Sequence, residues 1–189
     1  KNYYLKALEF DQNDKMIVNN LLILFLRIGD KNKAEYFYKK AREIDKNYIE
    51  FKLNESDYLI SQDQIEDAIK CLKTIINNSK NHIAYMKLSK IYSMIGDLKN
   101  SIEVIEEAIV AYPNQKDLKF TRGMYHLIEG EFEKGWEFYD FRDSIIKDNF
   151  YENLKTWKGE NLKDSTILVT SEQGMGDLIQ FSKFFINLS

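Results

Sequence analysis

The stretch His82–Gln115, HIAYMKLSKIYSMIGDLKNSIEVIEEAIVAYPNQ, decides the fold. Its apolar residues recur at helical spacing on both sides of Gly96-Asp97. Glycine can end a helix without the steric penalty of a Cβ atom. The small Ser101 near the start of the second helix allows that helix to approach the first closely. The stretch therefore predicts two antiparallel helices joined by a short turn.

The same arrangement recurs along the chain. Gly29-Asp30 precedes Ala34, and Gly130-Glu131 precedes Gly135. Ala68 stands 34 residues after Ala34 and 33 before Ser101, and Gly135 follows Ser101 by 34. One hairpin cannot bury its own apolar face, so neighbouring hairpins must stack. The sequence predicts an all-α solenoid.

These spacings resemble the tetratricopeptide repeat. In the unit 82–115, the signature positions are held by Tyr85, Leu88, Tyr92, Gly96, Ser101, Ala108 and Pro113. The resemblance divides residues 1–149 into a partial unit, 1–14, and the units 15–48, 49–81, 82–115 and 116–149. Residues 1–14 read as a second helix without its first. We therefore expect further residues upstream, because a terminal repeat normally carries a polar cap.

Composition narrows the function classes. The formal net charge of −3 gives no reason to expect nucleic-acid binding. Cys71 is the only cysteine, which fits a reducing cytoplasm and excludes an internal disulfide. No stretch approaches the roughly 18 consecutive apolar residues that a membrane span requires. His82 and His126 lack partners at ligand spacing, so we expect no metal site.

The resemblance implies that the first helices line a concave groove for a protein or peptide partner. The implied groove residues are Asn19, Asn20, Ile23, Arg27, Asn54, Asp57, Met86, Lys87, Lys90, Phe120 and Met124. The alternative is that these side chains are only solvated. One subclass of the family clamps a terminal carboxylate, but Ile23 stands where that clamp needs an asparagine.

The pattern changes after the repeats. Residues 150–164 read as a linker, in which Trp157 is either a domain-docking plug or a plain cap. Thr166–Thr170 is apolar and β-branched, which predicts a buried strand. A glycine turn and the apolar helix Leu178–Leu188 follow. Residues 165–189 therefore predict the first strand–turn–helix of a Rossmann-like α/β domain whose sheet lies downstream.

The segment from Gly130 to Phe185, with Glu172–Asp177 (EQGMGD) as its centre, resembles bacterial fusions of tetratricopeptide repeats to a heptosyltransferase-like GT-B glycosyltransferase. That resemblance implies a nucleotide-sugar donor and a glycan acceptor for the parent protein. It places Asp177 as a base at the acceptor hydroxyl, with Gly174 and Gly176 close to the ligand. The 189 residues alone are then not catalytic and hold no cofactor.

Two other interpretations remain open. The chain is a free-standing scaffold that binds peptides, or its repeats are fused to a nicotinamide-dependent Rossmann enzyme. The turn Gly174-Met175-Gly176 has two glycines of the dinucleotide fingerprint but not the third. An acidic residue about 20 positions beyond the turn would favour the dehydrogenase.

Overall fold

A computed structural model describes residues 2–139, 141–142, 154–155, 157, 159–169 and 175–188. The chain divides into two compact units, Lys1–Phe141 and Arg142–Ser189. Each unit is described by itself.

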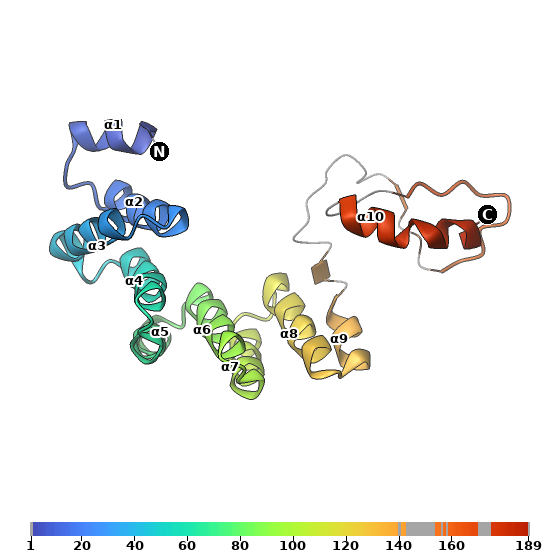
Figure 1. Cartoon of the computed structure of the whole chain (residues 1–189). Helices are drawn as coiled ribbons and strands as arrows, with labels where there is room; N and C mark the ends of the chain where they lie inside the picture. The colour runs from blue at the N-terminus through green and yellow to red at the C-terminus, as the bar shows by residue number, and fades with distance from the viewer. Residues whose placement is uncertain are drawn as a thin grey trace. The chain divides into compact units, whose positions relative to one another are not determined.

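The first unit is built from helices that follow one another in sequence order (Figure 1). Their bounds are α1 Asn2–Phe10, α2 Lys15–Ile28, α3 Lys31–Asp45, α4 Ile49–Ser61, α5 Ile65–Ser79, α6 His82–Met94, α7 Leu98–Ala111, α8 Lys116–Glu129 and α9 Phe132–Tyr139. Contacts run mainly within the pairs α2–α3, α4–α5, α6–α7 and α8–α9, and then from each pair to the next. The predicted all-α solenoid is confirmed for the described part of the chain. We call α2, α4, α6 and α8 the A helices, and α3, α5, α7 and α9 the B helices.

The Gly-Asp turns end one helix and begin the next. Gly29 has a φ of 77° and Gly96 a φ of 81°, both in the left-handed region that glycine adopts without strain. The side chains of Asp30 and Asp97 then accept backbone hydrogen bonds from Lys33 and Asn100, which caps α3 and α7. In each turn, the glycine thus ends one helix and the adjacent aspartate caps the first turn of the next helix.

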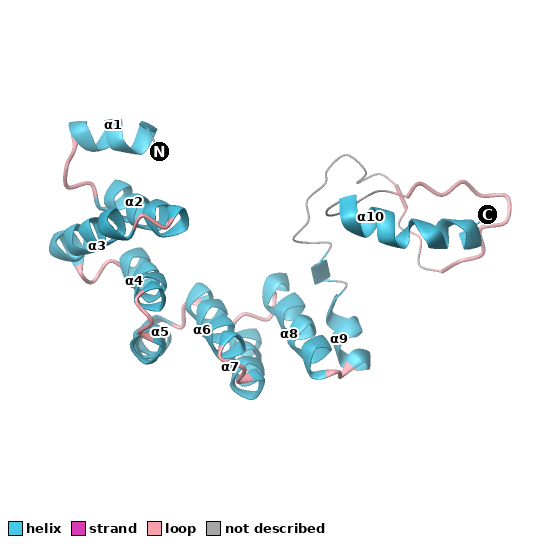
Figure 2. Cartoon of the chain, in the orientation of Figure 1, coloured by secondary structure: helices cyan, strands magenta, loops and turns pink. Residues whose placement is uncertain are grey.

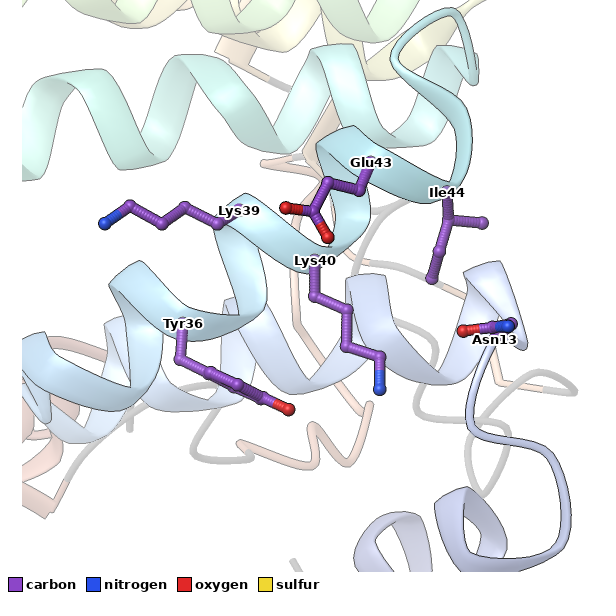
Figure 3. A pocket seen from close by; sticks show the side chains of 6 residues that line it. All are labelled: Asn13, Tyr36, Lys39, Lys40, Glu43 and Ile44. Atoms are coloured by element: carbon purple, nitrogen blue, oxygen red, sulfur yellow. The ribbon is translucent and has the colours of Figure 1, made fainter.

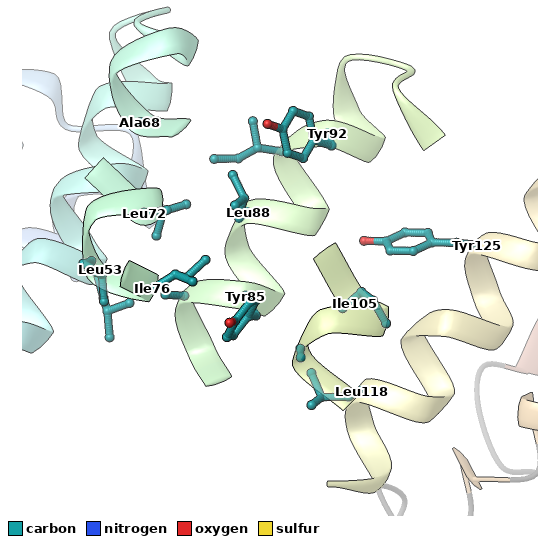
Figure 4. Packing of buried hydrophobic residues seen from close by; sticks show 14 residues of the cluster. Leu53, Ala68, Leu72, Ile76, Tyr85, Leu88, Tyr92, Ile105, Leu118 and Tyr125 are labelled. Carbon is teal, nitrogen blue, oxygen red and sulfur yellow. The ribbon is translucent and has the colours of Figure 1, made fainter. Parts of the chain in front are cut away.

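Two clusters of buried apolar side chains form the core. Helices α2, α3 and α4 contribute Val18, Leu21, Leu22, Phe25, Ala34, Phe37, Ala41 and Phe51 to one cluster. The other cluster extends from α4 to α8 and includes Leu72, Leu88, Ile105 and Leu118 (Figure 4). Helix α4 contributes Phe51 to the first cluster and Leu53 to the second, so it joins both. This is the nearest-neighbour stacking expected of a solenoid.

Small residues allow the two helices of a pair to approach closely. Ala34, Ala68 and Ser101 are fully or almost fully buried. Helices α8 and α9 approach closely, because a Cβ atom on Gly123 would lie 2.9 Å from the Gly135 carbonyl oxygen. A Cβ atom on Gly135 would lie 2.5 Å from Leu127 Cδ2. The predicted role of small side chains in packing is confirmed at these positions.

Tyrosine–glutamate hydrogen bonds reinforce the packing. The Tyr85 hydroxyl on α6 donates to Glu107 Oε1 on α7 at 2.8 Å. The Tyr38 hydroxyl on α3 donates to Glu55 Oε1 on α4 over the same distance. Burial, followed by the hydrogen bond to glutamate, raises the pKa of each tyrosine to about 12. Both phenols therefore stay protonated in the folded protein at any neutral pH.

The raised pKa values predict loss of stability in alkali. Unfolded tyrosine titrates near pH 10, so the stabilisation by a neutral Tyr85 is complete below about pH 10. It is lost as the pH rises through the folded-state pKa of about 12. We expect the free energy of unfolding, measured by urea titration, to fall less steeply in Tyr85→Phe than in the wild type over this range. Tyr3→Phe, at an exposed position, is the control. Equal slopes for Tyr85→Phe and the wild type would contradict the assignment.

The second unit departs from the prediction. The described residues Thr166–Val169 form no strand (Figure 2), so the strand predicted at Thr166–Thr170 is wrong over these four residues; Thr170 lies outside the described residues. A strand requires a neighbour to pair its backbone groups, and the described residues supply none. Leu168 and Val169 are accordingly exposed.

The predicted helix at Leu178–Leu188 is present in altered form. Helix α10 spans Met175–Phe181, and a 3-10 helix continues over Ser182–Leu188. The Ser182 hydroxyl donates to the Ile179 carbonyl oxygen at 2.8 Å, and such side-chain bonds compete with the regular backbone ladder. Phe181 and Phe184 are about half exposed. The Rossmann-like domain predicted for residues 165–189 is not present in the described residues.

Candidate partner-binding face

The residues proposed to line the groove lie on the four A helices, and we call them the A face. Its members are Asn19, Asn20, Ile23, Arg27, Asn54, Asp57, Met86, Lys87, Lys90, Phe120 and Met124. Asn20, Ile23 and Arg27 on α2 are three and four residues apart, a spacing that places them on one side of the helix. Helix α2 contacts α4 directly. The A-face residues of α2 and α4 therefore lie on neighbouring helices.

An ion pair joins α4 to α6 within the A face. Lys87 Nζ lies 2.6 Å from Asp57 Oδ1 and 2.7 Å from Oδ2. The side chains are 23% and 39% exposed, so solvent screens the pair only in part. Lys87, which the sequence predicted to bind a partner, already has a carboxylate of its own. The pair therefore acts as a tie between neighbouring repeats.

Other cations of the A face are free. Arg27 on α2 and Lys90 on α6 are exposed, and neither forms an ion pair with any described residue. A long cationic side chain without a carboxylate nearby is available to an anionic group from outside. These two residues are the charged groups with which the A face can attract a partner.

The amides of the A face differ in accessibility. Asn19 is only 4% exposed, and its Oδ1 has no hydrogen-bond partner among the described residues. Asn20 is exposed and Asn54 is half-buried. A buried oxygen without a donor costs about 1–3 kcal/mol, so Asn19 is a polar group that a donor would satisfy.

Apolar side chains complete the A face. Met124 is 37% exposed, whereas Ile23 and Met86 are half-buried. Phe120 packs against Tyr139 of α9, with ring centroids 5.4 Å apart. Phe120 therefore supports its own helix pair and also borders the A face.

A second polar cluster, which the sequence did not predict as a site, joins α7, α8 and α9. Arg122 Nη2 pairs with Glu106 Oε1 at 3.1 Å, and the guanidinium lies 4.4 Å from the centroid of the Phe138 ring. Arg122 Nε donates to His126 Nε2 at 3.4 Å. The only sequence signal was the spacing of four between Arg122 and His126, which places both side chains on one face of a helix.

His126 is buried within this cluster. Its Nε2 accepts from Arg122, so its Nδ1 is the donor to Glu131 Oε2 at 2.6 Å. Hydrogen bonds from Lys134 and then from His126 lower the pKa of Glu131. His126, Glu129 and Glu131 are close enough to hold a metal ion in principle. Because hydrogen bonds already occupy His126 and Glu131, the cluster functions as a packing network.

Cys71 is a poor nucleophile in this setting. Its Sγ lies 3.5 Å from the Lys52 carbonyl oxygen and 3.9 Å from Glu55 Oε2. Burial, followed by the charge of Glu55, raises the thiol pKa to about 11. The thiolate, which is the reactive form, is therefore scarce at neutral pH.

A pocket of about 700 Å³ lies beside helix α3 (Figure 3). It is lined by Asn13, Tyr36, Lys39, Lys40, Glu43 and Ile44. Lys39 is already paired with Glu35 at 2.6 Å. The remaining charges, Lys40 and Glu43, are of opposite sign, so the pocket has no strong preference for an anion or a cation.

Two of the residues proposed for catalysis and ligand binding, Gly176 and Asp177, lie in α10. Gly174 lies outside the described residues. Gly176 and the backbone of Asp177 belong to the first turn of α10. Trp157 is 42% exposed, and its indole donates to the Glu160 carbonyl oxygen at 2.7 Å. Of the turn motif Glu172–Asp177, the structure describes only Met175, Gly176 and Asp177, at the start of α10.

The architecture defines a class of α-solenoid built from stacked helix hairpins. Within it, residues 83–115 match the family model of the tetratricopeptide repeat. The described helices also share the fold of a tetratricopeptide repeat protein from Parabacteroides merdae, with a TM-score of 0.68 at 16% identity. That match covers 80% of this chain and 60% of the other. The repeat model thus matches one helix pair by sequence, and the described helices share the fold of solved tetratricopeptide repeat proteins.

Further solved structures show the same fold. A thermophilic tetratricopeptide repeat protein from Thermus thermophilus has a TM-score of 0.66 at 14% identity, covering 78% of this chain and 81% of its own. YrrB, described as a TPR protein with an unusual peptide-binding site, has a TM-score of 0.51 at 17% identity. That match covers 75% of this chain and 73% of YrrB.

Curated relatives match by sequence over parts of their length. The yeast anaphase-promoting complex subunit CDC16 (Saccharomyces cerevisiae) is 24% identical over 122 residues, which are 60% of this chain and 14% of that protein. The BBSome complex member BBS4 of Bos taurus is 26% identical over 125 residues, 66% of this chain and 23% of its own. The chain spans about a quarter or less of the length of these relatives.

Among the described residues, no helix combines the length and the apolar character that crossing a membrane demands.

Proposed function

We propose that the solenoid is a scaffold that holds a protein or peptide partner against its A face. The observation that carries this proposal is a pair of exposed cations on a face that also exposes apolar side chains. Arg27 and Lys90 have no ion-pair partner among the described residues. Ordered helices that expose apolar side chains beside free charges are typical of interaction surfaces. Two of the relatives, CDC16 and BBS4, are a subunit and a member of multiprotein complexes, which supports the same class of function.

The test uses a displayed library of random peptides of about 16 residues, a length sufficient to span several helix turns. Peptides selected on the wild-type protein are then measured by fluorescence polarisation on Arg27→Glu/Lys90→Glu. We expect their affinity to fall by about tenfold or more, the effect of losing one strong contact.

The matched control, Lys31→Glu/Arg42→Glu, makes the same charge change at exposed positions of α3. Circular dichroism confirms that both variants fold. If no peptide is selected, or if both variants weaken binding equally, the A face is not the binding surface.

A second proposal concerns the parent protein. We infer that the repeats are the partner-recruiting arm of a bacterial glycosyltransferase that uses a nucleotide-sugar donor and a glycan acceptor in the cytoplasm. The sequence Glu172–Asp177 supports it, together with the helix that begins at Met175 directly after the first glycine. Asp177 would serve as the acceptor base, with Gly174 and Gly176 beside the ligand.

The test is an assay of sugar transfer by the longer parent protein. The variant Asp177→Asn is expected to lose this activity. A parent protein that does not turn over any nucleotide sugar would contradict the proposal.

A further inference from the structure

Helices α6 and α8 expose apolar side chains in addition to those of the A face. On α6, Ile83, Met86, Lys90 and Met94 follow one another at intervals of three, four and four residues, so they share one side of the helix. Ile83 is 43% exposed and Met94 is 59% exposed. The side chains that a partner would meet along α6 are therefore apolar, with one lysine among them.

Helix α8 continues this surface. Phe120, Met124 and Ile128 recur at intervals of four residues, and Ile128 is 58% exposed. The Oγ1 atom of Thr121 on α8 lies 3.6 Å from Met86 Sδ on α6, which places the two rows side by side. We call Ile83, Met86, Lys90, Met94, Phe120, Met124 and Ile128 the α6–α8 face.

Methionine is concentrated on the A helices. Of the five methionines in the chain, Met16, Met86, Met94 and Met124 lie on α2, α6 and α8. Methionine has a flexible, polarizable side chain that adapts to irregular apolar partners. Its enrichment at exposed A-helix positions favours an apolar, shape-adaptable contact.

Hydrogen-bond chemistry decides what form the partner takes. An extended peptide would have to pair its backbone N–H and C=O groups with the face. The α6–α8 face offers little for this, because the Thr121 hydroxyl is already bonded to the Asp117 carbonyl oxygen at 2.8 Å. Lys90 supplies the remaining polar group. An α-helix satisfies its backbone internally and can present a purely apolar side.

Charge sets the polar edge of the partner. Lys90 is exposed and has no ion-pair partner in the described part of the chain, whereas the nearby Lys87 is neutralised by Asp57. A carboxylate beside the apolar stripe of a bound helix would therefore meet an unpaired cation.

We propose that the α6–α8 face binds an amphipathic helix of a partner protein, whose apolar side packs on the methionines and whose flanking Asp or Glu pairs with Lys90. This inference rests on the proposed scaffold function and specifies the class of partner. The bound helix carries apolar residues at positions i, i+3, i+4 and i+7.

The experiment uses the fluorescein-labelled peptides selected from the random library. We expect their sequences to show the helical apolar spacing, and their circular dichroism to gain helix content on binding. Met94→Gln/Met124→Gln should weaken them by about tenfold or more, because several apolar contacts are lost. The matched variant Tyr36→Gln/Val110→Gln, at exposed positions of B helices, should leave affinity unchanged.

Two further measurements separate the outcomes. A proline placed in the middle of a selected peptide should abolish binding, since it breaks a helix. Lys90→Glu should weaken an acidic peptide, and exchange of that acid for lysine should restore affinity. Selected peptides that tolerate proline and gain no helix would overturn the helix inference and leave the scaffold function intact. If no peptide is selected, both fail.

Discussion

Gly123→Val is expected to lower the free energy of unfolding by about 3 kcal/mol, the upper range for overpacking a tight helix contact. A Cβ atom at this position would lie 2.9 Å from the Gly135 carbonyl oxygen and 2.9 Å from Phe138 Cβ. The obstacles include backbone, so a rotamer change cannot relieve them. Helices α8 and α9 must instead move apart, which loses the packing of the last pair. Urea unfolding followed by circular dichroism measures the change.

Met124→Val is the control for this substitution. It places valine one residue further along α8, where the side chain is 37% exposed. The free energy of unfolding should then fall only by the lower helix propensity of valine, which is about 0.5 kcal/mol. Equal effects at positions 123 and 124 would mean that the close approach of α8 and α9 contributes nothing to stability.

Leu72→Ala is expected to cost about 3 kcal/mol, within the range for truncating a buried leucine. Leu72 is fully buried on α5, within the cluster that also holds Leu88 of α6 (Figure 4). The substitution removes apolar contacts and leaves a cavity between two repeats. Because stability in a solenoid is transmitted through neighbouring units, a defect at α5 should also uncouple the pairs on either side of it.

Hydrogen exchange reports this loss of coupling. In Leu72→Ala, the amides of α2 and α3 should exchange with one opening free energy, and the amides of α6 and α7 with a different one. Val110→Ala, at a position 83% exposed, should change neither the stability nor the exchange pattern by a measurable amount. A variant that still unfolds in one step with wild-type stability would contradict the expected role of Leu72.

Local rules explain why the repeats could be predicted. In the pair Gly29-Asp30, the glycine adopts the left-handed conformation of the turn and the aspartate caps the next helix. Small residues such as Ser101 mark close packing wherever the period recurs. These signals need no knowledge of distant parts of the chain.

Signals that depend on packing between elements were harder to predict. The Asp57–Lys87 pair joins residues 30 apart, and only the stacking of α4 on α6 brings them together. The strand expected at Thr166–Thr170 is absent over Thr166–Val169 for a related reason, because a strand requires a partner to pair its backbone groups. Asp63 shows a third kind of departure: it adopts a φ of 62° in the α4–α5 turn, where other pairs use glycine.

The sequential contacts of the helices have a consequence for synthesis of the protein. Each helix pair occupies about 34 consecutive residues. A ribosome adds roughly 5–20 residues per second, whereas a helix forms in about a microsecond. Each pair can therefore form and dock on its predecessor before the next pair has left the ribosome. A nascent chain of this kind exposes the apolar surface of a single hairpin at a time, which limits the opportunity for aggregation during translation.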